Sequence, residues 1–382
     1  MRPGMLVADD DDRREFDRRV SRGAGEPVSP SKGADVERLR QALAAAAGSR
    51  RTVSPRPWVG AVVVPAGAAP DHPGFAGATQ GRRGAEGPHA EVAALSAAGS
   101  SAAGSTLYVT LEPCCHAGER NRSCADAVVD AGVARVVVGV VDPDPRVAGR
   151  GLARLADAGV CVEVAGETAG LEAVADEVAT QLRPYLHHRR TGRPLVVLKL
   201  AASLDGRTAA PDGSSQWITG GEARRDAHEL RADSDAILVG AGTVRADDPA
   251  LTVRLDDLPD GFEQPLRVVL GRVPTDAAVQ PALELTGDLD EVLDELGRRG
   301  VLQLLVEGGA TVAHALHEAR LVDRYVLYLA PLLFGGDDAR GLFAGPGAAT
   351  LADAWRGRVV DLRRLGDDVR IDLDPVWVEG GA

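Results

Sequence analysis

The chain has 382 residues, of which 45% are hydrophobic, and a formal net charge of −13 at pH 7. That length favours two domains of ordinary size, each with its own hydrophobic core. An acidic chain is a poor binder of nucleic acid, although a local cluster of arginines can still hold one anionic ligand. We therefore expect a small charged metabolite as the substrate and no nucleic acid among the partners.

Apolar runs and cysteines indicate the compartment. No run reaches about 18 apolar residues, and no basic segment followed by an apolar run opens the chain, so we expect neither a membrane span nor a signal peptide. Three of the four cysteines, Cys114, Cys115 and Cys124, are clustered, which favours metal ligation over a disulfide framework. Cys161, between two valines, is expected to be a buried core thiol. These features predict a cytoplasmic protein.

The first half of the chain predicts an α/β layer. Residues 1–34 are rich in Asp, Arg, Pro, Ser and Gly and are interpreted as a disordered extension. Asp35 is expected to cap the first helix. Strands and helices then follow one another, which predicts parallel strand pairs. The strands are expected at 58–64, 106–111, 135–141 and 160–164, and the helices at 90–98, 125–131 and 151–158.

A set of possible metal ligands lies where these strands end and helices begin. His89 and Glu91 open one helix, Cys114 follows a strand, and Cys124 stands at the start of the next helix. Such junctions converge in an α/β sheet. One histidine and two cysteines leave a fourth zinc position for water, whose pKa zinc lowers to about 7. The pattern predicts a zinc deaminase in which Glu91 moves the protons.

A structural zinc is the alternative to a catalytic one. Cys115 or His116 can in principle supply a fourth ligand and so close the site to water. The sequence leaves this alternative open.

The second half begins after a helical stretch at 171–186. The tandem histidines His187 and His188, followed by arginines, are interpreted as a solvated linker. A second series of elements follows, with strands expected at 195–200, 236–240 and 302–306 and a helix at 221–232. Glycines at 240–242 and 308–309 follow strands and open helices, which is the geometry that holds phosphates. Taken alone, these glycines are more typical of packing turns, because neither forms a complete dinucleotide fingerprint.

Several motifs taken together resemble the bifunctional riboflavin-biosynthesis deaminase/reductase family. In the first half they are Thr110-Leu-Glu-Pro-Cys-Cys-His and Asp142-Pro-Asp-Pro-Arg-Val-Ala-Gly. In the second half they are Lys199-Leu-Ala-Ala-Ser-Leu-Asp-Gly-Arg, Ser215-Gln-Trp-Ile-Thr and Val306-Glu-Gly-Gly-Ala-Thr. The resemblance implies an α/β fold class with a cytidine-deaminase-like zinc domain at 35–166 and a dihydrofolate-reductase-like domain at 194–382. A helix and linker at 167–193 would join them.

The resemblance also implies site residues, cofactors and reactions. Zn²⁺ would be held by His89, Cys114 and Cys124, with Glu91 as the catalytic proton carrier. NADPH would contact Ala201, Trp217, Thr243, Asp247, Gly309, Ala310, Thr311, Val312, Ala313, His314 and Ala315. The substrate would contact Ser215, Arg231, Leu251, Arg254 and Glu307. The reactions would be deamination of a phosphoribosylamino diaminopyrimidinone, followed by NADPH-dependent reduction of its ribosyl chain to ribityl, in a homo-oligomer.

Three positions depart from the family pattern. Arg56 stands where the family has asparagine, Arg82 stands where it has a substrate-side histidine, and the cysteine loop at 118–123 is longer. An arginine offers only donors and a fixed charge to a base edge. An altered pyrimidine substrate, or a reductase carrying a zinc-stabilised scaffold, therefore remains an alternative. A nucleic-acid deaminase is disfavoured by the acidic charge.

Overall fold

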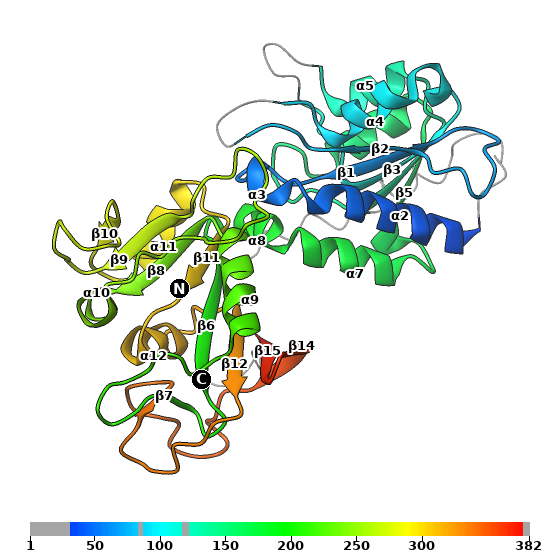
Figure 1. Cartoon of the computed structure of the whole chain (residues 1–382). Coiled ribbons are helices and arrows are strands. Elements are labelled where there is room, and N and C mark those ends of the chain that lie inside the picture. Colours follow the sequence, from blue (N-terminus) through cyan, green and yellow to red (C-terminus); the bar gives the residue numbers. More distant parts are fainter. Residues whose placement is uncertain (1–30, 83–86, 117–121, 377–382) are drawn as a thin grey trace. The chain divides into compact units, whose positions relative to one another are not determined.

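A computed structural model of the chain describes residues 31–82, 87–116 and 122–376. The chain divides into two compact units, Met1–Arg190 and Thr191–Ala382 (Figure 1). The extension expected at 1–34 lies outside the described residues up to residue 30, whereas Lys32 to Ala34 form the first turn of helix α2 (Lys32–Ala47). Among the described helices, none has the length and hydropathy needed to cross a bilayer.

The first unit contains a five-stranded sheet in the order β2-β1-β3-β4-β5. Its strands are β1 (Gly60–Val64), β2 (Phe75–Ala78), β3 (Thr106–Leu111), β4 (Arg135–Val140) and β5 (Cys161–Val164). The expected parallel pairing is confirmed for β3, β4 and β5. It is wrong for β1, which runs antiparallel to both neighbours. The reason is strand β2, which was not expected because its mostly small residues carry little signal for a strand. After β1 the chain turns back and forms β2 beside it, before helix α4 starts.

Helices cover both faces of this sheet. Helices α4 (Ala90–Ala98) and α5 (Cys124–Asp130) lie on one face, and α2 and α7 (Glu172–Gln181) lie on the other (Figure 1). Burial on both faces explains the continuous apolar run in β4, where Val136, Val137 and Val138 are fully buried. The other helices are α3 (Arg50–Val53), α6 (Arg150–Asp157) and α8 (Arg183–Thr191), with 3₁₀ turns at Gly99–Ala102 and Ala165–Glu167.

Asp35 and Cys161 differ from the expectation drawn from the sequence. Ser31, not Asp35, precedes α2, whereas Asp35 lies in the first turn of the helix and is fully buried. There its carboxylate accepts hydrogen bonds from both Nη atoms of Arg135, each at 2.9 Å, and from the Tyr108 hydroxyl at 2.8 Å. Cys161 is exposed rather than buried. It begins the edge strand β5, and side chains alternate along a strand, so Val162 takes the buried face instead.

The expected linker at the tandem histidines is also wrong. Helix α8 continues through His187 and His188 to Thr191, because Tyr185 and Leu186 keep one side of the helix buried against the first unit. Gly192, with a φ of 74°, ends it in the left-handed conformation that glycine adopts without strain.

The second unit contains an eight-stranded sheet in the order β10-β9-β8-β11-β6-β12-β15-β14. Pairing is parallel from β10 to β12 and antiparallel from β12 to β14. The strands are β6 (Leu195–Ser203), β8 (Ala236–Gly240), β9 (Leu266–Leu270), β10 (Leu283–Leu285), β11 (Gln303–Val306), β12 (Arg324–Ala330), β14 (Gly357–Leu365) and β15 (Asp368–Pro375). Strands β7 (Arg207–Ala209) and β13 (Arg340–Gly341) pair separately. The helices are α9 (Gly221–Ala232), α10 (Ala241–Asp247), α11 (Leu289–Arg298) and α12 (Ala310–Glu318).

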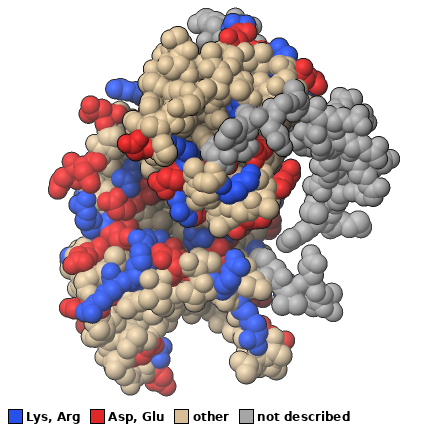
Figure 2. Space-filling view, turned by 90° about the vertical axis from the view of Figure 1, so that its right-hand side faces the viewer, with Lys and Arg blue, Asp and Glu red and all other residues tan. Residues whose placement is uncertain are grey.

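Charged side chains of both signs lie interspersed over the face of the molecule that Figure 2 shows. On that face, the negative net charge is therefore not gathered into one acidic field.

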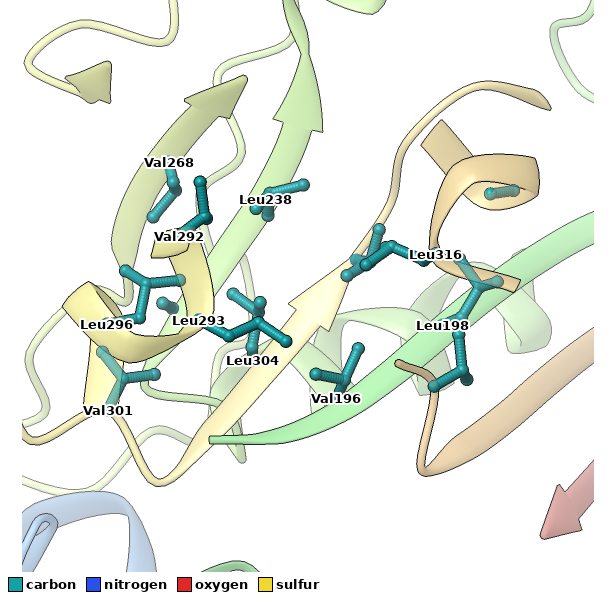
Figure 3. Packing of buried hydrophobic residues seen from close by; sticks show 14 of the residues in the cluster. Val196, Leu198, Leu238, Val268, Val292, Leu293, Leu296, Val301, Leu304 and Leu316 are labelled. Carbon is teal, nitrogen blue, oxygen red and sulfur yellow. The ribbon is translucent and has the colours of Figure 1, made fainter. Parts of the chain in front are cut away.

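The core of the second unit forms where helices close over the parallel strands. Helix α11 turns Val292, Leu293 and Leu296 toward Val268 of β9 and Leu304 of β11, and all of these are at most 3% exposed (Figure 3). Their spacing is that of one helical face, so the amphipathic pattern of α11 decides which side packs on the sheet. This rigid layer positions the loops that follow the strands.

Candidate active sites

Three side chains of the first unit converge at helix starts. His89 precedes α4, Cys114 lies in the loop after β3, and Cys124 begins α5. The Nδ1 atom of His89 lies 3.2 Å from the Cys124 sulfur and 3.7 Å from the Cys114 sulfur. Ligand atoms on one tetrahedral zinc are separated by about 3.3–3.8 Å. The three ligand atoms, all within 4.8 Å of one another, are therefore close enough to share one zinc ion.

The donor chemistry of this set also fits zinc. The Cys114 sulfur accepts hydrogen bonds from the Cys124 thiol and from the main-chain N–H of Cys124, the latter at 3.4 Å. Together with His89, these contacts lower the pKa of Cys114 well below its usual range, whereas the pKa of the Cys124 thiol is raised by the same contact and by burial. A thiolate is the form that binds metal. Cys115 donates instead to the carbonyl of Arg146 at 3.5 Å, and neither it nor His116 joins the converging group among the described residues.

Glu91 lies in the first turn of α4, outside the group of converging ligands. Its side chain is only 3% exposed. Burial, assisted by the nearby Cys114, raises the pKa of Glu91 to about 7. A carboxyl group with that pKa exchanges a proton readily near neutral pH, as a general acid and base must.

The cavity beside this set has a volume of about 260 Å³. Glu112 holds one of its walls together, since its carboxylate accepts four main-chain N–H bonds. The donors are Asp142 at 3.2 Å, Gly149 at 2.9 Å, Gly151 at 2.8 Å and Leu152 at 3.3 Å. The Glu-Pro-Cys-Cys motif thus contributes both a ligand and a structural anchor.

The two arginines that depart from the family pattern differ in placement. Arg56 lines the cavity and donates to the main-chain carbonyls of Gln80 and Gly87, the latter at 3.2 Å. It therefore ties down the segment that leads to His89. Arg82 is exposed and is not among the cavity-lining residues. Of the longer cysteine loop, residues 118–121 lie outside the described part of the chain.

Sequence reasoning missed a group of charged side chains at the same cavity. Arg146 donates twice to Asp144, at 2.7 and 3.0 Å, and Arg189 lies 3.7 Å from the same carboxylate. The Tyr185 hydroxyl donates to Asp142 at 3.0 Å. The motif Asp142-Pro-Asp-Pro-Arg marked one half of this group. Nothing marked Arg189 and Tyr185, because the helix that carries them was interpreted in part as a linker.

A second cavity, of about 710 Å³, lies in the second unit. Every residue outside the α12 turn that the sequence assigned to this site lines it. They are Ala201, Ser215, Trp217, Arg231, Thr243, Asp247, Leu251, Arg254 and Glu307.

The α12 turn adjoins this cavity. Its residues 309–315 are not among the lining residues, but the main-chain N–H of Gly309 donates to Thr243, a lining residue, at 3.2 Å. A Cβ atom at Gly308 would come within 2.7 Å of Val312, so this turn also requires glycine for packing. Gly309, which is exposed, and the first main-chain N–H groups of α12 form a cradle suited to a dinucleotide phosphate.

Charge in the second cavity is partly neutralised. Arg231 makes a two-point ion pair with Glu307, at 2.6 and 2.8 Å, and also donates to the carbonyl of Thr252 at 3.0 Å. Burial favours a neutral Glu307, but the Arg231 pair outweighs it and lowers the pKa of that carboxyl. Arg254, which is exposed, and Lys199, whose ammonium lies 5.7 Å from the Tyr328 ring centroid, both line the cavity and add positive charge to it.

Lys199 and Asp205, which belong to the same motif, differ in their placement. Lys199 lines the cavity, whereas Asp205 does not. Asp205 accepts main-chain N–H bonds from Phe334 at 3.0 Å and Gly335 at 2.8 Å. Asp205 therefore stabilises the segment 334–335 rather than the cavity.

Comparisons with known proteins cover both units. Residues 34–140 match the cytidine and deoxycytidylate deaminase zinc-binding region, and residues 194–371 match the RibD C-terminal domain. The riboflavin biosynthesis protein RibD of Escherichia coli (strain K12) is 41% identical over 374 residues, which cover 88% of this chain and 98% of the relative. Its counterpart in Mycobacterium tuberculosis (strain ATCC 25618 / H37Rv) is 42% identical over 335 residues, which cover 84% and 92%.

Solved structures give the same picture. Acinetobacter baumannii RibD has a TM-score of 0.80 at 35% identity, covering 91% of this chain and 100% of the relative. A diaminohydroxyphosphoribosylaminopyrimidine deaminase/5-amino-6-(5-phosphoribosylamino)uracil reductase from Thermotoga maritima has a TM-score of 0.77 at 28% identity, with coverages of 91% and 100%. These matches confirm the expected fold class, a cytidine-deaminase-like zinc domain followed by a dihydrofolate-reductase-like domain.

Proposed function

Because the chain belongs to the RibD family, and is thereby a bifunctional deaminase and reductase of riboflavin biosynthesis that uses Zn²⁺ and NADPH, we propose its substrate and the roles of its residues. The substrate is a diaminopyrimidinone with a phosphoribosylamino group, the class of compound named for the Thermotoga maritima relative. The first unit removes an amino group as ammonia, and the second reduces the ribosyl chain to ribityl.

One observation carries the proposal for the first unit: His89, Cys114 and Cys124 place their ligand atoms within 4.8 Å of one another next to the buried Glu91. Zinc, when bound, supplies a water made acidic enough to react near neutral pH. The Glu91 carboxylate takes a proton on the side facing the substrate and delivers it to the departing amino nitrogen. Burial of Glu91 keeps both protonation states accessible.

In the second unit, the chain binds and orients the two reactants. NADPH, when bound, supplies the hydride that reduces the ribosyl carbon. We assign its contacts to Ala201, Trp217, Thr243, Asp247 and residues 309–315. We assign the substrate contacts to Ser215, Arg231, Leu251, Arg254 and Glu307. A sugar phosphate needs charged donors around its oxygens, and Arg254 provides them without an acidic partner of its own among the described residues.

A related pyrimidine is the second candidate substrate for the first unit, and Arg56 favours it. The guanidinium stands at the cavity where the family has an asparagine side chain with both donor and acceptor. The usual substrate remains the first candidate, because Arg56 donates to the main-chain carbonyls of residues 80 and 87 and so acts on the loop before His89.

Release of ammonia separates these possibilities. The purified zinc-loaded protein, given the diaminopyrimidinone phosphate without NADPH, should release ammonia, and Glu91→Gln should lower the rate at least about 100-fold. The matched control is Glu172→Gln, an exposed glutamate in the first turn of α7, which should not change the rate. If the wild-type protein releases ammonia only from another aminopyrimidine, the second candidate replaces the first.

We propose the same division of activities as the sequence predicted, with deamination in 35–166, reduction in 194–382, and 167–193 joining them. The boundary of the compact units between Arg190 and Thr191 supports it. We also propose a cytoplasmic location, supported by four cysteines that form no disulfide, since a reducing compartment keeps cysteines unpaired.

The oligomeric state is proposed from strand β14. This outer strand of the large sheet exposes Val359, Val360 and Leu362, which are 55%, 38% and 64% exposed. These apolar side chains are interspersed with charged ones, and the outer edge of the strand also offers main-chain groups that can pair with another chain. We propose that two copies of the protein cover β14 in a homo-oligomer.

A further inference from the structure

Helix α9 turns a polar stripe toward the second cavity. Arg224, His228 and Arg231 recur at four- and three-residue intervals, the spacing of one helical face, and all three line the cavity. Arg224 donates to the carbonyl of Thr219 at 2.7 Å and lies over the Trp217 ring, 4.8 Å from its centroid. Arg231 is held by Glu307. His228, between them on the stripe, has no role in the site so far.

The position of His228 fixes which of its ring nitrogens carries the proton. The main-chain N–H of Arg254 donates to its Nδ1 atom at 3.2 Å, so Nδ1 is the acceptor. In a neutral imidazole the other nitrogen, Nε2, must then be the donor. No hydrogen bond from Nε2 to another described residue accompanies this contact.

The surroundings keep His228 neutral. Partial burial, together with the positive charges of Arg231, Arg254 and Lys199, lowers the pKa of His228 to about 4, against the opposing effect of Glu307. A neutral ring can donate from Nε2 without adding another positive charge beside two arginines. The geometry therefore leaves one oriented donor on the cavity wall, attached to the main chain of Arg254.

We propose that His228 positions the substrate of the reductase: its Nδ1 holds the main chain of Arg254, and its Nε2–H donates to an oxygen of the sugar phosphate. This inference rests on the proposed function of the second cavity. The bond to Arg254 orients the phosphate-binding guanidinium, and the Nε2 donor adds a neutral contact next to it. His228 takes no part in the hydride transfer, so it acts on binding.

Three variants of His228 separate these two bonds. His228→Asn keeps an acceptor at the position of Nδ1 but lacks the outer donor, His228→Gln offers a donor near the position of Nε2 but lacks the inner acceptor, and His228→Leu lacks both. Loss of both bonds should raise KM for the deaminated substrate about tenfold or more. KM for NADPH should stay unchanged, and kcat should change less than about threefold. Asn and Gln should each recover part of the affinity.

His72 provides the matched control. Its Nδ1 also accepts a main-chain N–H, from Gly74 at 2.9 Å, but it lies in the first unit. His72→Leu should leave the kinetics of the reductase unchanged. An unchanged KM in His228→Leu, or equal losses of affinity for substrate and NADPH in the folded Asn and Gln variants, would overturn the inference. Failure of the wild-type protein to oxidise NADPH with the deaminated substrate would instead overturn the proposed function itself.

Discussion

At the scale of single residues, Glu112 shows how one carboxylate can organise a whole loop. Its four main-chain donors all belong to the segment 142–152, which carries Asp142, Asp144 and Arg146 of the first cavity. In Glu112→Gln, an amide NH₂ group would face N–H donors, so about two of these bonds would be lost in a buried site. We expect the free energy of unfolding of the first unit to fall by about 1–3 kcal/mol, as measured by calorimetry. An unchanged unfolding transition would show that the bonds to Glu112 do not stabilise the segment 142–152.

Protonation of His228 makes the stability of the second unit depend on pH. Its pKa is about 4 in the folded protein and about 6.5 in an unfolded chain, so the unfolded chain takes up the proton first as the pH falls. Stability is therefore full above about pH 6.5, decreases as the pH falls toward about 4, and levels off below it. The decrease should be smaller in His228→Asn, which cannot titrate. Thermal unfolding of both proteins across this pH range measures the difference, and parallel curves would contradict the assignment.

Spacing along the chain made some site residues predictable and left others hidden. His89, Cys114 and Cys124 stand at helix starts after strands, where the topology of an α/β sheet brings ligands together, and their convergence follows. The contacts of Arg56 were not predictable, because its partners are main-chain carbonyls that any residues at 80 and 87 would offer. His228 was not predicted as a site residue, because only its place on the polar stripe of α9 indicates it.

At the scale of elements, a buried ion pair joins helix α2 to the sheet. Arg135 of β4 is 2% exposed, and its partner Asp35 is fully buried. Removing only Arg135, in Arg135→Met, should destabilise the first unit by about 3–5 kcal/mol because it leaves an uncompensated carboxylate. The double variant Arg135→Met with Asp35→Leu should recover much of this loss. Hydrogen exchange of the main-chain amides in β3 and β4 would measure the stability of each variant. Additive effects of the two substitutions would show that the pair is not coupled.

Apolar patterning predicted the elements with strong periodicity. Strand β3 and helices α4 and α9 have the expected bounds, because each is a continuous apolar or amphipathic segment with a clear end. Strand β2 was missed, since Phe-Ala-Gly-Ala carries little preference for a strand until β1 pairs with it. Helix α8 ran further than expected because tertiary burial of Tyr185 and Leu186 outweighs the polar histidines and arginines after them.

At the scale of the whole molecule, strand β14 predicts assembly. The substitution Leu362→Lys would place a charge among the exposed apolar side chains of the outer strand β14, in the proposed contact between copies, while leaving the fold of the exposed strand intact. Leu362→Lys should shift the sedimentation of the protein toward the monomer. Leu351→Lys, at a residue that is 83% exposed outside this strand, is the control and should sediment as the wild type does. A wild-type protein that sediments as a monomer would contradict the proposed oligomer.

The two reactions proposed for this chain predict a fixed ratio between ammonia released and NADPH oxidised. From the diaminopyrimidinone phosphate with zinc and NADPH present, the protein should release one ammonia for each NADPH oxidised, because we propose that the second unit accepts only the deaminated compound. The Glu91→Gln protein should do neither with this compound, yet should oxidise NADPH normally when given the deaminated one.

The ratio of ammonia released to NADPH oxidised therefore tests most directly whether the two units act in sequence on one compound. A ratio of one in the wild-type protein, with an ammonia burst before NADPH is consumed, is the predicted result. Oxidation of NADPH without release of ammonia would contradict the account, because it would mean that the first unit does not deaminate the compound that the second unit reduces.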